Sequence, residues 1–73
     1  MKDVYSLFEL IGKNIKKIRN EKLKISQEKM AEDLEMSRSY ISHIESPKFN
    51  IGISIDTLFY ISQMYKIDIK KFF

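Results

Sequence analysis

The segment at residues 37–45, SRSYISHIE, carries several side chains that can hydrogen-bond to nucleic acid. An arginine such as Arg38 can donate two parallel hydrogen bonds to a guanine in the major groove, and serine or histidine can bond to base edges or phosphates. Wound as a helix at about 100° per residue, the segment places Ile41 and Ile44 on one side. It is therefore predicted to dock through two isoleucines and to leave a polar face free. The polar residues on that face and its flank are Arg38, Ser39, Tyr40, Ser42 and His43.

Two serines stand where short helices would begin. The hydroxyls of Ser26 and Ser37 can each accept a hydrogen bond from an otherwise unpaired backbone N–H of the first helical turn. Because only two residues separate the predicted helices 26–34 and 37–45, the pair cannot lie antiparallel and must cross steeply. The buried face of the first helix is formed by Met30, Ala31 and Leu34.

A long amphipathic helix is predicted over residues 4–18, because its apolar residues fall within a stripe about 100° wide. Its basic residues and the adjacent Arg19 are expected on solvent-facing sides. Residues 20–25 break the pattern, with Leu23 and Ile25 as inward-pointing plugs. The apolar stripe comprises Val4, Leu7, Phe8, Ile11, Ile15 and Ile18.

A further helix, capped by Ser54, is predicted over residues 54–66 and is followed by a short helical turn that begins at Asp68. Ile67 and the aromatic pair Phe72 and Phe73 are expected to close the core. Together these elements predict an all-α fold, a compact bundle of five helices in a single domain spanning 1–73. The inward stripe of the 54–66 helix is Ile55, Leu58, Ile61, Ser62 and Tyr65.

Composition argues against an enzyme. The 73 residues include one histidine and no cysteine, and no Gly-rich phosphate loop or metal-ligand spacing is present, so no cofactor and no metal site are expected. No apolar run approaches the roughly 20 residues needed to span a bilayer, which predicts a cytoplasmic protein with no membrane partner. The net charge of +3 is compatible with a nucleic-acid partner without requiring one.

The run SQEKMAEDLEMSRSYISHIE, with IGKNIKKIR before it and SIDTLFYISQMYKIDIKKFF after it, resembles the helix-turn-helix domain of the Cro and lambda-repressor-like family. The resemblance covers nearly the whole chain from Ile11 and places the motif at 26–45. Within that family, the run RSYIS at 38–42 in so short a chain is similar to the controller proteins of bacterial restriction–modification systems.

The resemblance implies an autoregulatory homodimer that binds double-stranded operator DNA and controls transcription, with RNA polymerase as a further candidate partner. It implies that Arg38 and Ser39 contact bases, and that Asn50 assists from the following loop. The DNA-binding residues predicted from pattern and resemblance together are Gln27, Ser37, Arg38, Ser39, Tyr40, Ser42, His43, Lys48 and Asn50.

Three features depart from the family pattern. Glu35 stands where the family usually has a glycine, so a positive φ there would carry strain of about 1 kcal/mol. The loop NEKLKI is one residue longer than usual and also lacks glycine. The loop SPKFNIGI is about two residues longer, and Phe49 occupies a position that is often basic in controller proteins.

Some of the singled-out residues also have a purely structural reading. Arg38 can be a solvated surface residue or the ion-pair partner of Glu35 or Glu45. Tyr40 can be a half-buried aromatic, and His43 a solvated polar position. Phe72 and Phe73 can belong either to the core or to a contact between subunits.

Exposed aromatic residues on the 54–66 helix predict a dimer contact within residues 54–73. A two-fold dimer through this region would place two recognition helices about 34 Å apart, one turn of DNA. The predicted contact residues are Phe59, Tyr60, Met64, Phe72 and Phe73.

Two other functions fit the same residues. One is an anti-regulator, a protein-interaction module that keeps the helical fold without binding DNA, which the acidic segment 28–35 and the exposed aromatics favour. The other is a minimal phage-type repressor, although such repressors normally add a separate dimerisation or ligand domain.

Overall fold

The described part of the chain is entirely helical. The structure is a computed structural model and describes residues 4–46 and 53–73. The elements are α1 (Val4–Lys17), the π-helical segment η1 (Ile18–Leu23), α2 (Gln27–Leu34), α3 (Arg38–Glu45), α4 (Ile55–Tyr65) and the 3-10 turn η2 (Ile69–Phe72). The prediction of an all-α bundle is confirmed for these residues, but the predicted count of five helices is met only in part. The fifth element is a single 3-10 turn of 4 residues, too short to be an α-helix.

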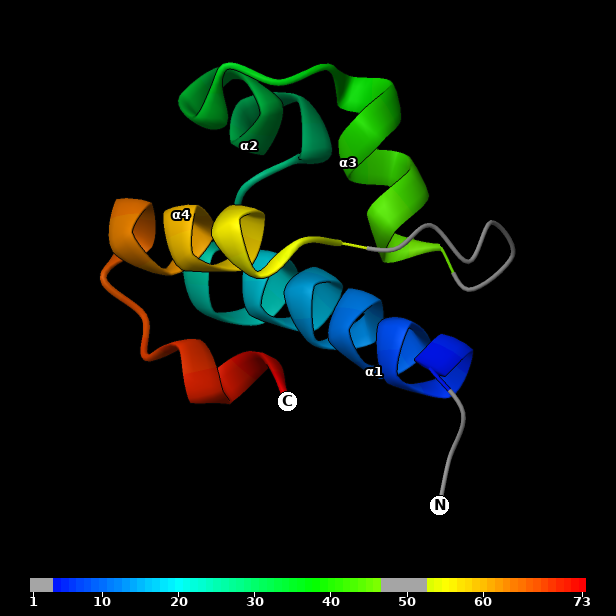
Figure 1. The fold of residues 1–73 in the computed structure, drawn as a ribbon. Coiled ribbons are helices and arrows are strands. Elements are labelled where there is room, and N and C mark those ends of the chain that lie inside the picture. The colour runs from blue at the N-terminus through cyan, green and yellow to red at the C-terminus, as the bar shows by residue number, and fades with distance from the viewer. Residues whose placement is uncertain (1–3, 47–52) are drawn as a thin grey trace.

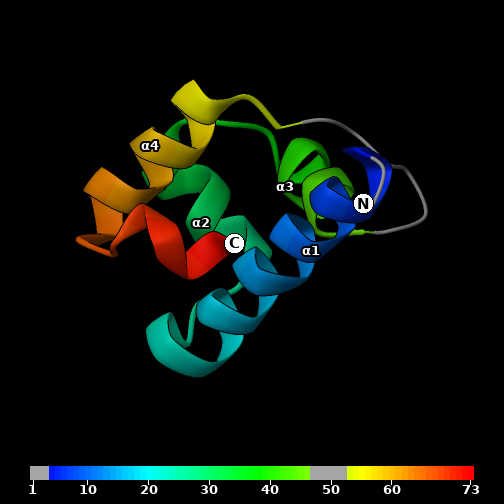
Figure 2. The same cartoon turned by 60° about the horizontal axis from the view of Figure 1, so that its bottom comes forward.

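The helices are arranged around α1. α3 packs on both α1 and α2, while η2 packs on α1 and α4. In Figure 1 the pair α2 and α3 lies above α1, and η2 lies below it. The view in Figure 2 brings η2 and the C-terminus to the front, with α3 behind. The two-helix motif and the C-terminal turn therefore lie on different sides of α1.

The core is formed by residues from all four α-helices, η2 and the segments that flank α4. The prediction that Leu7 and Ile55 point into the core is wrong, because these side chains are 40% and 60% exposed. Both lie in the first turn of a helix, at the end of the core. Leu23 and Ile25 pack against the core as predicted. The buried apolar residues are Ile11, Ile15, Met30, Ala31, Leu34, Ile41, Ile44, Ile53, Leu58, Ile61, Ile67 and Phe72.

The C-terminal turn is fixed to α1 by packing and by one hydrogen bond. Phe72 is buried, and its backbone carbonyl accepts a hydrogen bond of 2.9 Å from the side-chain amide of Asn14. The Asp68 carboxylate caps the turn by accepting from the N–H of Lys70 at 3.0 Å. Phe73 is 52% exposed, so of the aromatic pair only Phe72 closes the core, together with the buried Ile67.

α2 and α4 are joined by tyrosine hydroxyls. Tyr65 donates to the Asp33 carboxylate at 2.9 Å, and Tyr60 donates to the Leu34 carbonyl at 3.3 Å. The pKa of Asp33 is lowered, first by its hydrogen bond with Lys29 and then by the bond from Tyr65. Burial is the main cause of the raised pKa of Tyr65. These contacts hold the first helix of the two-helix motif on α4.

Gly12 lies in the middle of α1, where glycine is usually unfavourable. A Cβ atom at this position would overlap the backbone carbonyl oxygen of Ile44 and would lie 3.5 Å from the Cα of Glu45. The missing side chain therefore lets α1 pass directly against the last turn of α3.

A buried ion pair joins η1 to the end of α3. Arg19 donates to Glu45 through Nε at 2.7 Å and through a terminal nitrogen at 2.9 Å. The same guanidinium donates to the Ile25 carbonyl at 2.8 Å, and the side-chain amide of Gln27 donates to Glu45 at 3.0 Å. The hydrogen bond to Glu45 is the main cause of the raised pKa of Arg19. The placement of Arg19 on a solvent-facing side was wrong, because it is only 5% exposed.

The buried position of Arg19 follows from helical spacing. The residue lies four positions after Ile15 and eight after Ile11, so winding at about 100° per residue already places it at the edge of the buried stripe of α1. Its charge, and not its position, led to the solvent-facing prediction. The chain changes to π-helical hydrogen bonding at Ile18, and after Leu23 the C-cap Lys24 has φ 55°. The Arg19 carbonyl accepts from the N–H groups of Lys24 and Ile25.

Within the described residues, none of the helices combines the length and the apolar character required to cross a membrane.

We expect Gly12→Ala to lower the free energy of unfolding by about 1–3 kcal/mol, as overpacking typically does, despite a gain in helix propensity of about 1 kcal/mol. The backbone carbonyl of Ile44 cannot move aside by side-chain rotation. Urea unfolding followed by far-UV circular dichroism measures the change. Lys13→Ala, at the exposed neighbouring position, should change the free energy by less than about 0.5 kcal/mol. A Gly12→Ala variant as stable as the native protein would show that α1 and α3 are not in such close contact.

We expect Arg19→Met to lower the free energy of unfolding by about 3–5 kcal/mol, because it leaves the Glu45 carboxylate buried without its cation. The double variant Arg19→Met/Glu45→Leu should lose much less than the sum of the single changes. Thermal or urea unfolding of the four proteins in this cycle gives the coupling energy. If Glu45→Leu alone yields too little folded protein, Glu45→Gln, which keeps the shape of the side chain, takes its place in the cycle. Strictly additive losses would contradict a direct interaction.

Candidate nucleic-acid interface

The two-helix motif is built from local hydrogen bonds that follow the predicted pattern. The Ser26 hydroxyl accepts from the N–H of Lys29 at 3.0 Å, and the Ser37 hydroxyl accepts from the N–H of Tyr40 at 3.0 Å. Both predicted N-caps are confirmed. Figure 1 shows the steep crossing of α2 and α3 that the short connection was expected to impose.

Glu35 forms the left-handed end of α2. Its φ is 56° and its ψ is 44°, so the positive φ anticipated at this non-glycine residue is present. Its backbone N–H is directed to the carbonyls of Ala31 and Glu32, and the N–H of Met36 donates to Ala31 at 2.9 Å. The turn keeps its hydrogen bonds even though a side chain replaces the hydrogen of glycine.

α3 has one buried face and one polar face. Ile41 is completely buried and Ile44 nearly so, which confirms the two predicted anchors. Arg38 and Ser39, in the first turn, are exposed. Ser42 and His43 are half-buried, and Ser37 is exposed at the cap position. The end of α3 nearest its N-terminus is therefore the most accessible part of its polar face.

Tyr40 and Gln27 have structural contacts in addition to their predicted role. Tyr40 is half-buried and packs against the core, as its structural reading allowed. Gln27 uses one N–H of its amide to hold Glu45, and its second N–H can donate to another acceptor. The predicted contact residues Lys48 and Asn50, and Phe49, lie outside the described residues.

Arg38 does not make the ion pairs that its structural reading offered. Glu45 is bound by Arg19 and Gln27 instead. Within residues 4–46 and 53–73, the ion pairs are Arg19 with Glu45 and Lys29 with Glu32 and Asp33. The Arg38 guanidinium is thus an exposed cation at the start of α3.

Sequence patterns did not reveal Arg19 and Glu45 as a pair. Glu45 was considered as the residue that ends the motif and as an ion-pair partner of Arg38, and not as a partner of Arg19. A signal was nevertheless present, because an acid that directly follows a buried anchor at Ile44 is placed close to the core and requires a cation there. The only arginine outside the motif is Arg19.

The motif itself is acidic. Residues 26–45 contain five carboxylates, against one lysine and one arginine, which gives a formal charge of −3 with histidine neutral. Glu45 is neutralised by Arg19, and Asp33 is paired with Lys29 at 3.1 Å. The exposed carboxylates are Glu28, Glu32 and Glu35, all on or next to α2, and of these Glu32 lies 3.7 Å from the ammonium group of Lys29.

Comparison with known proteins places this geometry in a family. The model of a family described as "Helix-turn-helix domain" matches residues 12–73. A curated protein from Mycoplasma sp, "Control protein C.MunI", is 40% identical over 42 residues, which is 58% of this chain and 57% of that protein. The match thus spans little more than half of the relative's length. No solved structure matches the chain. Since the family model covers the capped helix pair, the buried anchors and the C-terminal turn, this chain belongs to the helix-turn-helix domain family, with the sequence pattern of a controller protein.

Proposed function

We propose that this protein is a sequence-specific, double-stranded DNA-binding transcription regulator that inserts α3 into the major groove. The observation that carries the proposal is the orientation of α3. Ile41 and Ile44 anchor the helix, while Arg38 and Ser39 are exposed in its first turn. In a helix-turn-helix domain, the N-terminal residues of the second helix are the ones nearest the bases.

The side chains divide into two roles. Arg38 and Ser39 read base edges, with the arginine donating two bonds to one guanine. The hydroxyl of Ser37 is already used as the cap of α3. The contact with a phosphate at this end is therefore made by backbone N–H groups of the first turn of α3. The remaining residues mainly fix the position of the sugar–phosphate backbone: Gln27, Tyr40, Ser42, His43, Lys48 and Asn50.

A homodimer through α4 completes the proposed regulator. Phe59 is 56% exposed, and Tyr60 and Met64 on α4 and Phe73 after η2 are also exposed. Burial of these side chains between two subunits would stabilise a small domain and align two α3 helices with successive major grooves about 34 Å apart. Phe72 is excluded from this contact, because its side chain is in the core.

The likeness to a control protein supports a regulatory role of this kind. The regulated operon is proposed to be that of a restriction–modification system, with the protein acting on its own gene and with RNA polymerase as its partner in transcription. This part of the proposal rests on the pattern RSYIS and on the relative.

One observation favours a second candidate, an anti-regulator that binds protein and not DNA. The formal charge of −3 on residues 26–45 opposes the phosphate backbone, and a DNA-binding surface usually owes its non-specific affinity to basic residues. The two candidates differ in salt dependence, because only the DNA-binding protein releases counterions from the duplex.

We expect selection from randomised duplex DNA to yield a palindromic site, and Arg38→Ala to weaken binding to it by about 1–3 kcal/mol while relaxing one symmetric base position. The loss reflects two hydrogen bonds to one guanine that alanine cannot replace. Lys24→Ala removes the same charge away from α3 and should weaken all sequences equally, through the salt-dependent term alone. No enriched site, with Arg38→Ala equal to the native protein, would instead support the anti-regulator.

We expect Phe59→Ser to raise the dissociation constant of the dimer by about tenfold or more, since removal of a central apolar contact typically costs over 1 kcal/mol. Sedimentation velocity over a range of concentrations measures the monomer–dimer equilibrium. Leu7→Ser is the matched control, because this leucine is also partly exposed but lies on α1. An unchanged equilibrium in Phe59→Ser, or an equal loss in Leu7→Ser, would place the dimer contact elsewhere.

A further inference from the structure

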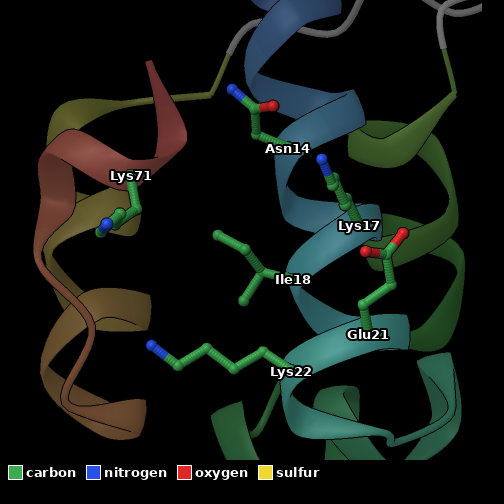
Figure 3. Close-up of a pocket in the computed structure, with 6 residues that line it drawn as sticks. All are labelled: Asn14, Lys17, Ile18, Glu21, Lys22 and Lys71. Carbon is green, nitrogen blue, oxygen red and sulfur yellow. The ribbon is translucent and has the colours of Figure 1, made fainter.

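Two adjoining hollows lie on the side of the molecule formed by α1, η1 and η2. The first has a volume of about 260 Å³, and Figure 3 shows the residues around it. The second, of about 600 Å³, shares three residues with the first and extends along α1. We call the whole surface the basic face. It comprises Leu10, Lys13, Asn14, Lys16, Lys17, Ile18, Asn20, Glu21, Lys22 and Lys71.

The positive charge of the protein is concentrated on the basic face. It contains five lysines and one glutamate, so its formal charge of +4 exceeds the +3 of the whole chain. None of these lysines takes part in the ion pairs found among the described residues. Five lysines therefore line a concave surface, and none of them is held in one of these ion pairs with a carboxylate.

The first hollow is held in shape by the fold. Lys71 belongs to η2, which the hydrogen bond from Asn14 to the Phe72 carbonyl and the burial of Phe72 fix against α1. In Figure 3, Lys22 extends from η1 toward the turn that carries Lys71, and Ile18 reaches into the space between them. Lys22 and Lys71 therefore line one hollow from elements far apart in the sequence.

The basic face is separate from the proposed DNA-reading surface. Figure 3 shows η2 on one side of α1 and α3 on the other, as Figure 1 does from a different direction. A duplex bound at α3 would leave the basic face open to a second molecule. The five lysines are accordingly not among the DNA-contacting residues proposed above.

The apolar side chains among the lysines distinguish between nucleic acid and an acidic protein segment as the ligand. Ile18 is half-buried at the first hollow, and Leu10, which lines the second, is 44% exposed. In a sugar–phosphate backbone the apolar groups are the C–H groups of the sugars, which lie between charged phosphates and cover aliphatic side chains poorly. An acidic protein segment with aliphatic side chains satisfies both the charge and the apolar surface.

We infer that the basic face binds an acidic segment of a partner protein, in which carboxylates pair with Lys17, Lys22 and Lys71 and an aliphatic side chain covers Ile18. The segment enters between α1 and η2. This binding goes beyond the proposed regulation of transcription and does not depend on it, because α3 takes no part.

The test uses the full chain and a fluorescein-labelled peptide of aspartates with two leucines spaced three residues apart. Fluorescence anisotropy measures its affinity, and amide chemical shifts identify the residues that it perturbs. We expect perturbation at Ile18, Lys22 and Lys71, and about a threefold to tenfold loss of affinity in Lys22→Gln/Lys71→Gln, the range for two partly exposed ion pairs. The control Lys66→Gln/Lys70→Gln makes the same change of charge on exposed lysines that do not line the hollows.

Several outcomes would overturn the inference. Equal losses in the two double variants would show attraction by net charge alone. A peptide with serine in place of both leucines that binds equally well would show that Ile18 is not covered. If Lys22→Gln/Lys71→Gln weakens binding to random duplex DNA more than binding to the peptide, the basic face is a nucleic-acid surface. If chemical shifts at these residues depend on protein concentration without peptide, a second copy of the chain occupies it.

Discussion

The buried ion pair between Arg19 and Glu45 determines how the second helix of the motif is held. It ties the end of α3 to η1, and through Gln27 it includes the start of α2. Removal of two charges from water is costly, and the cost is offset here by hydrogen bonds to the carboxylate and by the guanidinium bond to Ile25. Among the described residues no buried side-chain polar atom lacks a partner. Such an interaction contributes geometry more than stability, because it is satisfied only when all three segments are in place.

In the part of the chain that the structure describes, glycine serves helix packing at Gly12, and the left-handed turns are formed by other residues. Gly12 permits close contact of α1 with α3, whereas η1, α2 and α4 end at Lys24, Glu35 and Lys66, with φ of 55°, 56° and 55°. Each left-handed position costs a side-chain residue about 1 kcal/mol. The three C-caps keep their backbone hydrogen bonds, so the strain is confined to the dihedral angles and does not shift the helices.

Features that depend on nearby residues could be predicted from the sequence, and features that depend on distant ones could not. The caps Ser26, Ser37 and Ser54 use N–H groups three residues away, and the anchors of α3 follow from helical spacing. The need for glycine at position 12 comes from a carbonyl on another helix, and Arg19 was placed in solvent because the carboxylate that pairs with it, Glu45, is 26 residues away. Helical spacing and the resemblance together supplied the site residues on α3, and the structure supplies their exposure. The structure also shows that Phe72, and not Phe73, enters the core. The sequence could not predict this, because two adjacent residues of the same type are equally suited to burial.

Charge is separated between two regions of the molecule. Residues 26–45 are negative, whereas the surface formed by α1, η1 and η2 is positive. At distances within the Debye length, about 8 Å at physiological salt, the field of a duplex turns the positive side of such a body toward itself. In the regulator proposed above, the first encounter with DNA would therefore be made in an orientation that cannot read bases, and the protein would have to rotate before α3 entered the groove. Short-range hydrogen bonds and shape, and not long-range attraction, would then decide which sequences retain it.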